Sequence, residues 1–258
     1  MKFPFAPRCF CPDLESLHEA IPDHEFHHLL HVLRLSEGDA VVLFDGKGRY
    51  QTAHIVRRDK RRCELEAASA AALAPPPTPQ ITAGLAIAKH EAWHEALALC
   101  VALGVSVIQP IVSERVEVRI REQEIEEKMR KWERVLIESA KQCASFYLPR
   151  LERPLGVEEF VSRAVESRHM IVASLEEEAR PLGYFFDQVK HSSFVLLIGP
   201  EGDFSLREYA LARDHGFWAV SLGSAILRCP VALTVLLSQL RYAFEDWERR
   251  KGARLGLV

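Results

Sequence analysis

The chain has 258 residues, of which 48% are apolar and 27% are charged, and its formal net charge is −3. This balance is ordinary for a globular protein and argues against a general nucleic-acid coat, although a local basic patch is compatible with it. No apolar stretch approaches the roughly 20 residues that cross a bilayer, and the first residues lack the apolar segment of a signal peptide. We therefore expect a cytoplasmic protein with no membrane partner.

The six cysteines are scattered along a chain of ordinary size, so reduced thiols are a better interpretation than a disulfide scaffold. Cys9 and Cys11 are close together, but no second pair follows at zinc-finger spacing. His24, His28 and His31 fall near one helical face without a set of carboxylate or thiol partners, which favours a solvated face over a metal site. We expect no metal.

A run of prolines divides the sequence. Four prolines in "APPPTP" can neither continue a helix nor donate to a sheet, and they predict a stiff, extended linker. We assign residues 1–73 to a first domain, 74–79 to the linker and 80–258 to a second domain.

The first domain reads as a short helix at 23–33, then a strand, a turn and a strand within 40–56, and another strand at 63–67. These elements predict a small, strand-rich barrel. In the second domain helices alternate with strands, with helices at 91–104, about 125–144, 205–215 and 230–247 and strands at 105–112, 169–173, 194–198 and 218–223. This alternation predicts an α/β fold with a mostly parallel sheet.

Two of the predicted strands end in glycine-containing loops, "IGPEG" at 198–202 and "SLGSAILR" at 221–228. In open parallel sheets, ligands bind outside the carboxyl ends of strands, and glycine lets backbone groups approach a ligand closely. Neither loop carries a dinucleotide-binding or P-loop pattern. For any one of these glycines, a plain tight turn is the alternative.

The stretch 196–228, "LLIGPEGDFSLREYALARDHGFWAVSLGSAILR", resembles the signature of the SPOUT-superfamily methyltransferases of the RsmE type, which modify N3 of a uridine in 16S ribosomal RNA. The stretches 27–55, 86–118 and 132–151 resemble the same family in the same order. The resemblance implies an amino-terminal PUA-like barrel, a catalytic domain with a trefoil knot, a homodimer, and the small ribosomal subunit as partner.

The resemblance also implies that S-adenosylmethionine is the cofactor and that knot loops hold it. By motif position, one wall of the site would be Leu197, Ile198, Gly199 and Gly202, and the other Leu222, Gly223, Ile226 and Leu227.

The sequence departs from the family pattern at the reactive end of this site. The family has Gly-Gly where this chain has Gly202-Asp203, and Thr-Glu-Thr-Ala where it has "CPVA" at 229–232. Glu-Gln followed by an arginine is replaced by Lys141-Gln142 and then Ser145.

Arg228 remains as the candidate catalytic residue, because a fixed cation stabilises charge developing on the uracil oxygens; a helix-end salt bridge is the alternative. The missing glutamate keeps two other functions open, an RNA-binding or ribosome-assembly protein without catalysis and a methyltransferase with another RNA target.

Basic residues predict the RNA-binding surface. The run "RRDKRR" lies on a turn between two strands, where phosphates would give salt-dependent, sequence-independent affinity; a solvated turn is the alternative. Three further arginines match basic positions of the family. The candidate RNA-binding residues are Arg8, Arg34, Arg57, Arg58, Lys60, Arg61, Arg62 and Arg115.

Overall fold

The structure, a computed structural model, describes residues 6–16, 21–116, 121–164, 169–188 and 193–254. The chain forms two compact units. Unit 1 consists of residues 1–76 and 136–148, and unit 2 of residues 77–135 and 149–258. Among the described residues, no helix combines the length and apolar character needed to cross a membrane.

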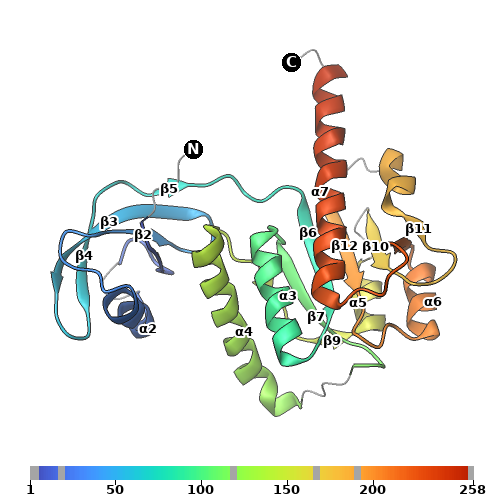
Figure 1. Cartoon of the computed structure of the whole chain (residues 1–258), viewed down its shortest axis with the longest axis horizontal. Helices are drawn as coiled ribbons and strands as arrows, with labels where there is room; N and C mark the ends of the chain where they lie inside the picture. The colour runs from blue at the N-terminus through green and yellow to red at the C-terminus, as the bar shows by residue number, and fades with distance from the viewer. Residues whose placement is uncertain (1–5, 17–20, 117–120, 165–168, 189–192, 255–258) are drawn as a thin grey trace. The chain divides into compact units, whose positions relative to one another are not determined.

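Unit 1 is a strand-rich fold, as the sequence predicts. Its sheet has the order β1-β2-β3-β4, with β5 also paired to β3, and every pairing except β1 with β2 is antiparallel. The predicted helix at 23–33 is divided into an α-helical and a π-helical turn, and Figure 1 shows α2 against one side of the sheet. The elements are β1 (Arg8–Phe10), α2 (Asp23–His27), η1 (His28–Val32), β2 (Ala40–Phe44), β3 (Arg49–Arg58), β4 (Cys63–Ala67) and β5 (Ala72–Leu73).

Helix α4 (Glu122–Cys143) begins in unit 2, and its residues from Leu136 onward belong to unit 1. There Lys141 forms a buried ion pair with Glu25 of α2, with Nζ 2.8 Å from Oε1 and side-chain exposures of 6% and 0%. Glu138 accepts a second contact from the same ammonium at 2.6 Å. Burial would lower the pKa of Lys141, but hydrogen bonds to these carboxylates outweigh it and raise the pKa. Lys141, a departure from the family pattern, is therefore a structural cation of unit 1.

Unit 2 is an α/β fold with a parallel sheet, which confirms the predicted fold class. The sheet has the order β11-β13-β10-β12-β6-β7-β8, with β9 also paired to β7, and every pairing is parallel. The central strand β6 is absent from the sequence prediction. The strands are β6 (Gln80–Ala86), β7 (Val107–Val112), β8 (Arg150–Leu151), β9 (Leu155–Gly156), β10 (Met170–Ala173), β11 (Arg180–Pro181), β12 (Ser193–Ile198) and β13 (Trp218–Ser221).

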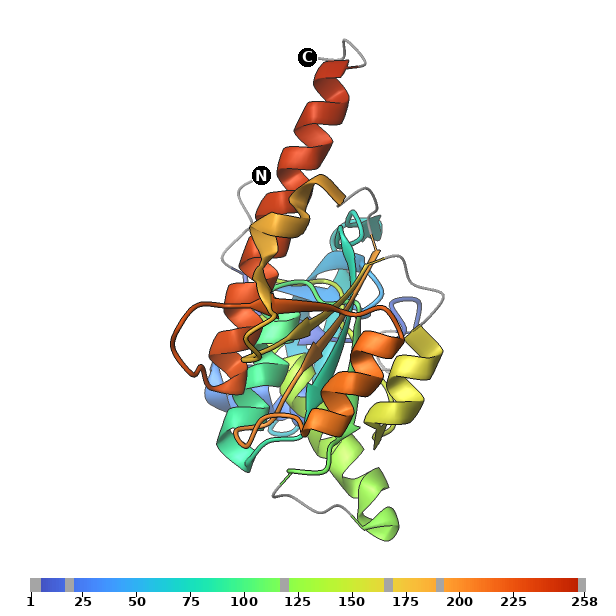
Figure 2. The same cartoon turned by 90° about the vertical axis from the view of Figure 1, so that its right-hand side faces the viewer.

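Helices cover both faces of this sheet. Figure 2 shows α3 and α7 on one face and α5 and α6 on the other, and each pair packs together. Helix α6 begins with a capping box, in which the Ser205 hydroxyl accepts from the Glu208 amide and the Glu208 carboxylate accepts from the Ser205 amide. The helical elements are α3 (His90–Ala102), α5 (Val157–Ala164), the 3₁₀ helix η2 (Leu182–Gln188), α6 (Leu206–Asp214) and α7 (Cys229–Arg254).

The buried ion pair predicts a large effect on stability. Lys141→Met should lower the free energy of unfolding by about 3 kcal/mol, because it leaves the Glu25 carboxylate buried without a counter-ion. Adding Glu25→Gln should restore most of the loss. Denaturant unfolding followed by circular dichroism measures both.

Lys131→Met is the matched control on the same helix. Lys131 pairs with Glu127, and both side chains are more than 60% exposed, so its loss should cost less than about 1 kcal/mol. Equal losses for Lys131→Met and Lys141→Met would contradict the structural role of the buried pair.

Candidate functional site

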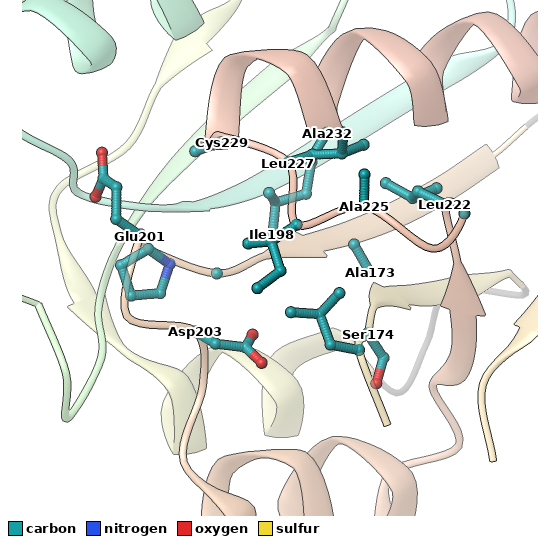
Figure 3. Close-up of a pocket in the computed structure, with 15 residues that line it drawn as sticks. Ala173, Ser174, Ile198, Glu201, Asp203, Leu222, Ala225, Leu227, Cys229 and Ala232 are labelled. Carbon is teal, nitrogen blue, oxygen red and sulfur yellow. The ribbon is translucent and has the colours of Figure 1, made fainter. Parts of the chain in front are cut away.

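A pocket lies at the carboxyl ends of three neighbouring strands, β13, β10 and β12. Each strand contributes the residues at or just after its end, and the first turn of α7 closes the remaining side (Figure 3). This is the edge at which open parallel sheets bind ligands. The lining residues are Ala173, Ser174, Leu175, Ile198, Gly199, Pro200, Glu201, Asp203, Leu222, Gly223, Ala225, Ile226, Leu227, Cys229 and Ala232.

The loop after β12 is a tight turn held by a backbone hydrogen bond and by a side chain of α6. The Asp203 amide donates to the Pro200 carbonyl at 2.9 Å, and Asp203 has a φ of 59°. This left-handed conformation costs a residue with a Cβ roughly 1–2 kcal/mol. The Tyr209 hydroxyl donates to Asp203 Oδ1 at 2.6 Å and holds the carboxylate in place. A Cβ at Gly199 would lie 3.3 Å from the same Oδ1 atom, so glycine allows the turn to close.

The loop after β13 presents its backbone to open space. Gly223 has a φ of 120°, which requires glycine, and no heavy atom lies within 4 Å of where its Cβ would be. Ile226 is 81% exposed although it lines the pocket. The loop then enters α7, where the Ala232 amide donates to the Arg228 carbonyl at 2.9 Å. Pro230 lies in this first helical turn, where its missing N–H leaves no partner unsatisfied.

The ionisable groups of the lining are acidic or neutral. Glu201 and Asp203 contribute carboxylates, whereas the lining includes no Lys, Arg or His among the described residues. Burial, followed by the charge of Glu201, raises the pKa of the Cys229 thiol to about 12, so the thiol is protonated at neutral pH. No group of three or more His, Cys, Asp or Glu in the described part of the chain is arranged to hold a metal ion.

Arg228 lies beside the pocket and outside its lining. Its neighbours Leu227 and Cys229 both line the pocket, and its own side chain is 67% exposed. Its Nη1 atom is 3.8 Å from Oε2 of Glu95 on α3, a distance that allows only a weak, solvent-screened ion pair. The guanidinium is therefore open to a further partner.

Arg115, a candidate RNA-binding residue, contacts the loop after β12. Its Nη1 donates to the Gly202 carbonyl at 3.2 Å. The adjacent Glu114 amide donates to the buried Glu208 carboxylate of the α6 capping box at 2.8 Å. The segment after β7 is therefore fastened to the loop that forms one wall of the pocket.

The structure brings most of the predicted cofactor-binding residues together. Leu197 lies outside the lining, because side chains alternate along β12 and its side chain is buried in the core cluster with residues of α5 and α6. Gly202 also lies outside, where its Cβ would face Arg115. The predicted residues that line the pocket are Ile198, Gly199, Leu222, Gly223, Ile226 and Leu227.

The basic turn of unit 1 runs from the end of β3 to the start of β4. Asp59 orders it by accepting from the amides of Arg61 and Arg62 at 2.6 and 2.8 Å. Two of its arginines also have structural contacts: Arg58 donates to the Leu35 carbonyl at 2.6 Å, and Arg62 donates to Asp23 at 2.5 Å. A groove beside the turn is lined by residues that include Arg57, Arg58 and Arg62.

The other two candidate arginines of unit 1 lie apart from the basic turn along the chain. Arg8 is half-buried, and its guanidinium lies 5.7 Å from the centre of the Phe146 ring. Arg34 is exposed and has a φ of 57° just after η1.

Sequence reasoning missed three polar groups of the site. Ser174 follows a strand that the sequence predicts, but no glycine marks its end. Asp203 stands out in the sequence only as a departure from the family pattern, and Tyr209 carries no sequence signal of its own. Asp203 and Tyr209 are six residues apart, and their contact depends on the conformation of the loop and first helical turn that join them.

Comparison with known proteins identifies two domains. The family profile described as the RNA methyltransferase domain matches residues 75–241, and the one described as the RNA methyltransferase PUA domain matches residues 21–67. Ribosomal RNA small subunit methyltransferase E of Synechocystis sp. is 30% identical over 234 residues, covering 86% of this chain and 72% of that protein. The protein of the same name from Mycobacterium tuberculosis is 26% identical over 248 residues, covering 92% and 90%.

Solved structures agree over the same span. A Legionella pneumophila protein solved with S-adenosylmethionine bound is 28% identical and has a TM-score of 0.84, with 92% of this chain and 98% of that chain covered. Ribosomal RNA small subunit methyltransferase E of Neisseria gonorrhoeae, also bound to S-adenosylmethionine, is 27% identical with a TM-score of 0.80, covering 92% and 97%. The family resemblance found in the sequence is confirmed. This chain belongs to the ribosomal RNA small subunit methyltransferase E family and carries its RNA methyltransferase domain together with a PUA domain.

Proposed function

We propose that this protein transfers the methyl group of S-adenosylmethionine to N3 of a uridine in 16S ribosomal RNA of the small subunit. The observation that carries the proposal is the pocket between two glycine loops at the carboxyl edge of the sheet, in a fold that two relatives share while binding S-adenosylmethionine. The names of the curated relatives supply the RNA substrate. A cytoplasmic location goes with that substrate.

The residues of the pocket fit the cofactor. The backbone at Gly223 faces open space that any side chain would fill, and Gly199, on the loop after β12, lies in the same lining. The acidic lining suits a ligand that carries a positive sulfonium. The residues that would contact the cofactor are Ile198, Gly199, Leu222, Gly223, Ile226 and Leu227. Leu197 and Gly202 would instead hold the loop after β12 in position.

Arg228 is the residue that we assign to the reaction. When bound, S-adenosylmethionine supplies an electrophilic methyl group, which N3 of the uracil accepts after losing its imide proton. The exposed guanidinium of Arg228 would donate to the uracil oxygens on which negative charge develops. It lies next to Leu227 and Cys229 of the pocket lining, so the uracil would approach from the α7 side. The proton would leave to water or to a nearby carboxylate.

The chain path supports a knot, and the pocket rim supports a dimer. The connections run from β10 to β12 and then back past β10 to β13, and we propose that the terminal segment is threaded through the preceding loops.

Ile226 and Leu175 expose apolar side chains at the rim, where a partner subunit would cover them. Light scattering at micromolar concentration should give about twice 29.2 kDa; a monomer would contradict the dimer.

The basic turn of unit 1 would bind RNA phosphates. Arg57, Arg58 and Arg62 line one groove and could meet consecutive phosphates. Lys60 and Arg61 lie at the exposed tip of the same turn. Arg8, Arg34 and Arg115 remain proposed RNA contacts, although Arg115 already supports the loop after β12.

Methyl transfer to small subunits that lack the modification tests the function. The wild type should transfer the labelled methyl group to 16S ribosomal RNA, and Arg228→Ala should be at least about tenfold slower, because losing one preorganised donor typically costs 10²–10³ in rate. Arg228→Lys should recover only part of the rate, since an ammonium lacks the planar fork of the guanidinium.

Glu95→Gln is the matched control. It removes the ion-pair partner of Arg228 and leaves the guanidinium in place, so it should retain close to the wild-type rate. If Glu95→Gln is as slow as Arg228→Ala, the arginine acts through its salt bridge and its catalytic role is wrong. If the wild type binds cofactor and RNA but transfers no methyl group, the protein is the non-catalytic RNA-binding alternative.

The RNA surface has a separate test. Arg57→Ala/Arg61→Ala should weaken RNA binding and reduce the slope of log K against log [salt] by about 1–2, because fewer counterions are released. This pair avoids Arg58 and Arg62, whose contacts support the turn. Cofactor affinity should not change, and Arg249→Ala/Arg250→Ala, a charge-matched pair on α7, should keep the wild-type slope. An unchanged slope for the turn variant would place the RNA surface elsewhere.

A further inference from the structure

The charge of the pocket lining is one-sided. Its carboxylates belong to Glu201 and Asp203, and the described lining residues include no Lys, Arg or His; outside the lining, Arg115 donates to the Gly202 carbonyl between them. The Cys229 thiol carries no charge at neutral pH, because burial and the charge of Glu201 raise its pKa to about 12. These carboxylates therefore stabilise a positively charged ligand in the pocket more than a neutral ligand of the same shape.

The two carboxylates differ in position and in exposure. Glu201 is exposed, and Figure 3 shows its carboxylate at the periphery of the pocket. Asp203 is half-buried, and its carboxylate lies on the same side of the cavity as Ser174 (Figure 3). Because solvent screens exposed charges more strongly than partly buried ones, Asp203 has the larger effect on a bound charge.

The position of the Asp203 carboxylate is fixed by the fold. The Tyr209 hydroxyl, on a side chain that is 2% exposed, donates to Oδ1 at 2.6 Å. Oδ2 has no hydrogen-bond partner from the described residues and remains able to face a ligand. Asp203 thus places an ordered acidic group in the pocket, although its backbone has a left-handed conformation that residues with a Cβ rarely adopt.

We propose that Asp203 makes this pocket select a cationic adenosyl ligand over a neutral one, and thereby favours the sulfonium cofactor over the thioether product. The inference rests on the proposed cofactor site. Methyl transfer converts the sulfonium of S-adenosylmethionine into the neutral thioether of S-adenosylhomocysteine, so the attraction to Asp203 ends with the reaction. The pocket therefore holds the product less tightly than the cofactor, and a new cofactor molecule displaces it more readily than it would from an uncharged pocket.

Calorimetric titration with three ligands tests this selection. S-adenosylmethionine carries a sulfonium, sinefungin carries an amine in its place, and S-adenosylhomocysteine carries neither. Asp203→Asn should weaken the binding of both cationic ligands by about three- to tenfold, as expected for one partly screened charge. The affinity for S-adenosylhomocysteine should change less than about twofold. Asp214→Asn, which makes the same substitution on the exposed surface of α6, should leave all three affinities unchanged.

Two further variants separate charge from folding and position. Asp203→Gly removes the charge and is unstrained at a φ of 59°, so it should fold and show the same loss of selectivity. Tyr209→Phe keeps the buried ring and removes the hydroxyl that positions Asp203. It should lower the ratio of the affinity for S-adenosylmethionine to that for S-adenosylhomocysteine by a smaller factor than Asp203→Asn does.

The outcomes are distinct. If Asp203→Asn and Asp203→Gly weaken all three ligands equally, Asp203 contacts a group that the ligands share, and charge selection is wrong. If neither substitution changes any affinity, Asp203 is not a selective group and the proposal is also overturned. If the wild type binds none of the three ligands, the cofactor site itself, and with it the proposed function, is wrong.

Discussion

The parallel pairing of β12 between β10 and β6 is the constraint on which the rest of unit 2 depends. In this register Leu197 is opposite Val172, and Ile198 is opposite Leu85, so the carboxyl ends of the three strands coincide. β13 pairs with β10 on its other side. The loops that leave β12 and β13 therefore flank the end of β10, and a pocket forms between them without any long insertion. A change of register in β12 would displace the Gly199 turn from Ser174 and open the pocket.

Around this pocket, the departures from the family pattern are each accommodated by a local interaction. Asp203 adopts the backbone conformation of a glycine and is held by Tyr209. Cys229 is buried at the start of α7, and Pro230 occupies a turn whose amides need no intrahelical partner. These changes alter the chemical groups of the site while the strand order and the helix starts are kept. The fold therefore accommodates these residues, and the proposed ligand preference rests on one of them, Asp203.

Local sequence patterns were enough to predict the elements that carry the site. The strand expected at 194–198 and the helices expected at 205–215 and 230–247 correspond to β12, α6 and α7. The central strand β6 was not predicted, because "QITAGLA" follows the prolines and is rich in Ala and Gly, which have low strand propensity. Its pairing with β12 and β7, which defines it as a strand, depends on residues far away in sequence. The contact of Lys141 with Glu25 was out of reach for the same reason. The contact of Asp203 with Tyr209, six residues apart, depends on the left-handed turn at Asp203, which no sequence pattern indicates.

The two proposals for the site place a negative charge in the pocket lining and a positive charge beside it. Asp203 lies within the pocket lining, and Arg228 lies just outside it at the start of α7. Methyl transfer to uracil N3 brings a cationic sulfonium together with a nucleophile that has lost a proton and is therefore negative. The sulfonium would lie near the negative Asp203, and the uracil anion near the positive Arg228. A carboxylate beside the cofactor and a guanidinium beside the base would stabilise each partner before reaction. Because both charges disappear from the reacting atoms as the bond forms, the same arrangement favours release of both products, which is what a site acting on many ribosomal subunits in turn requires.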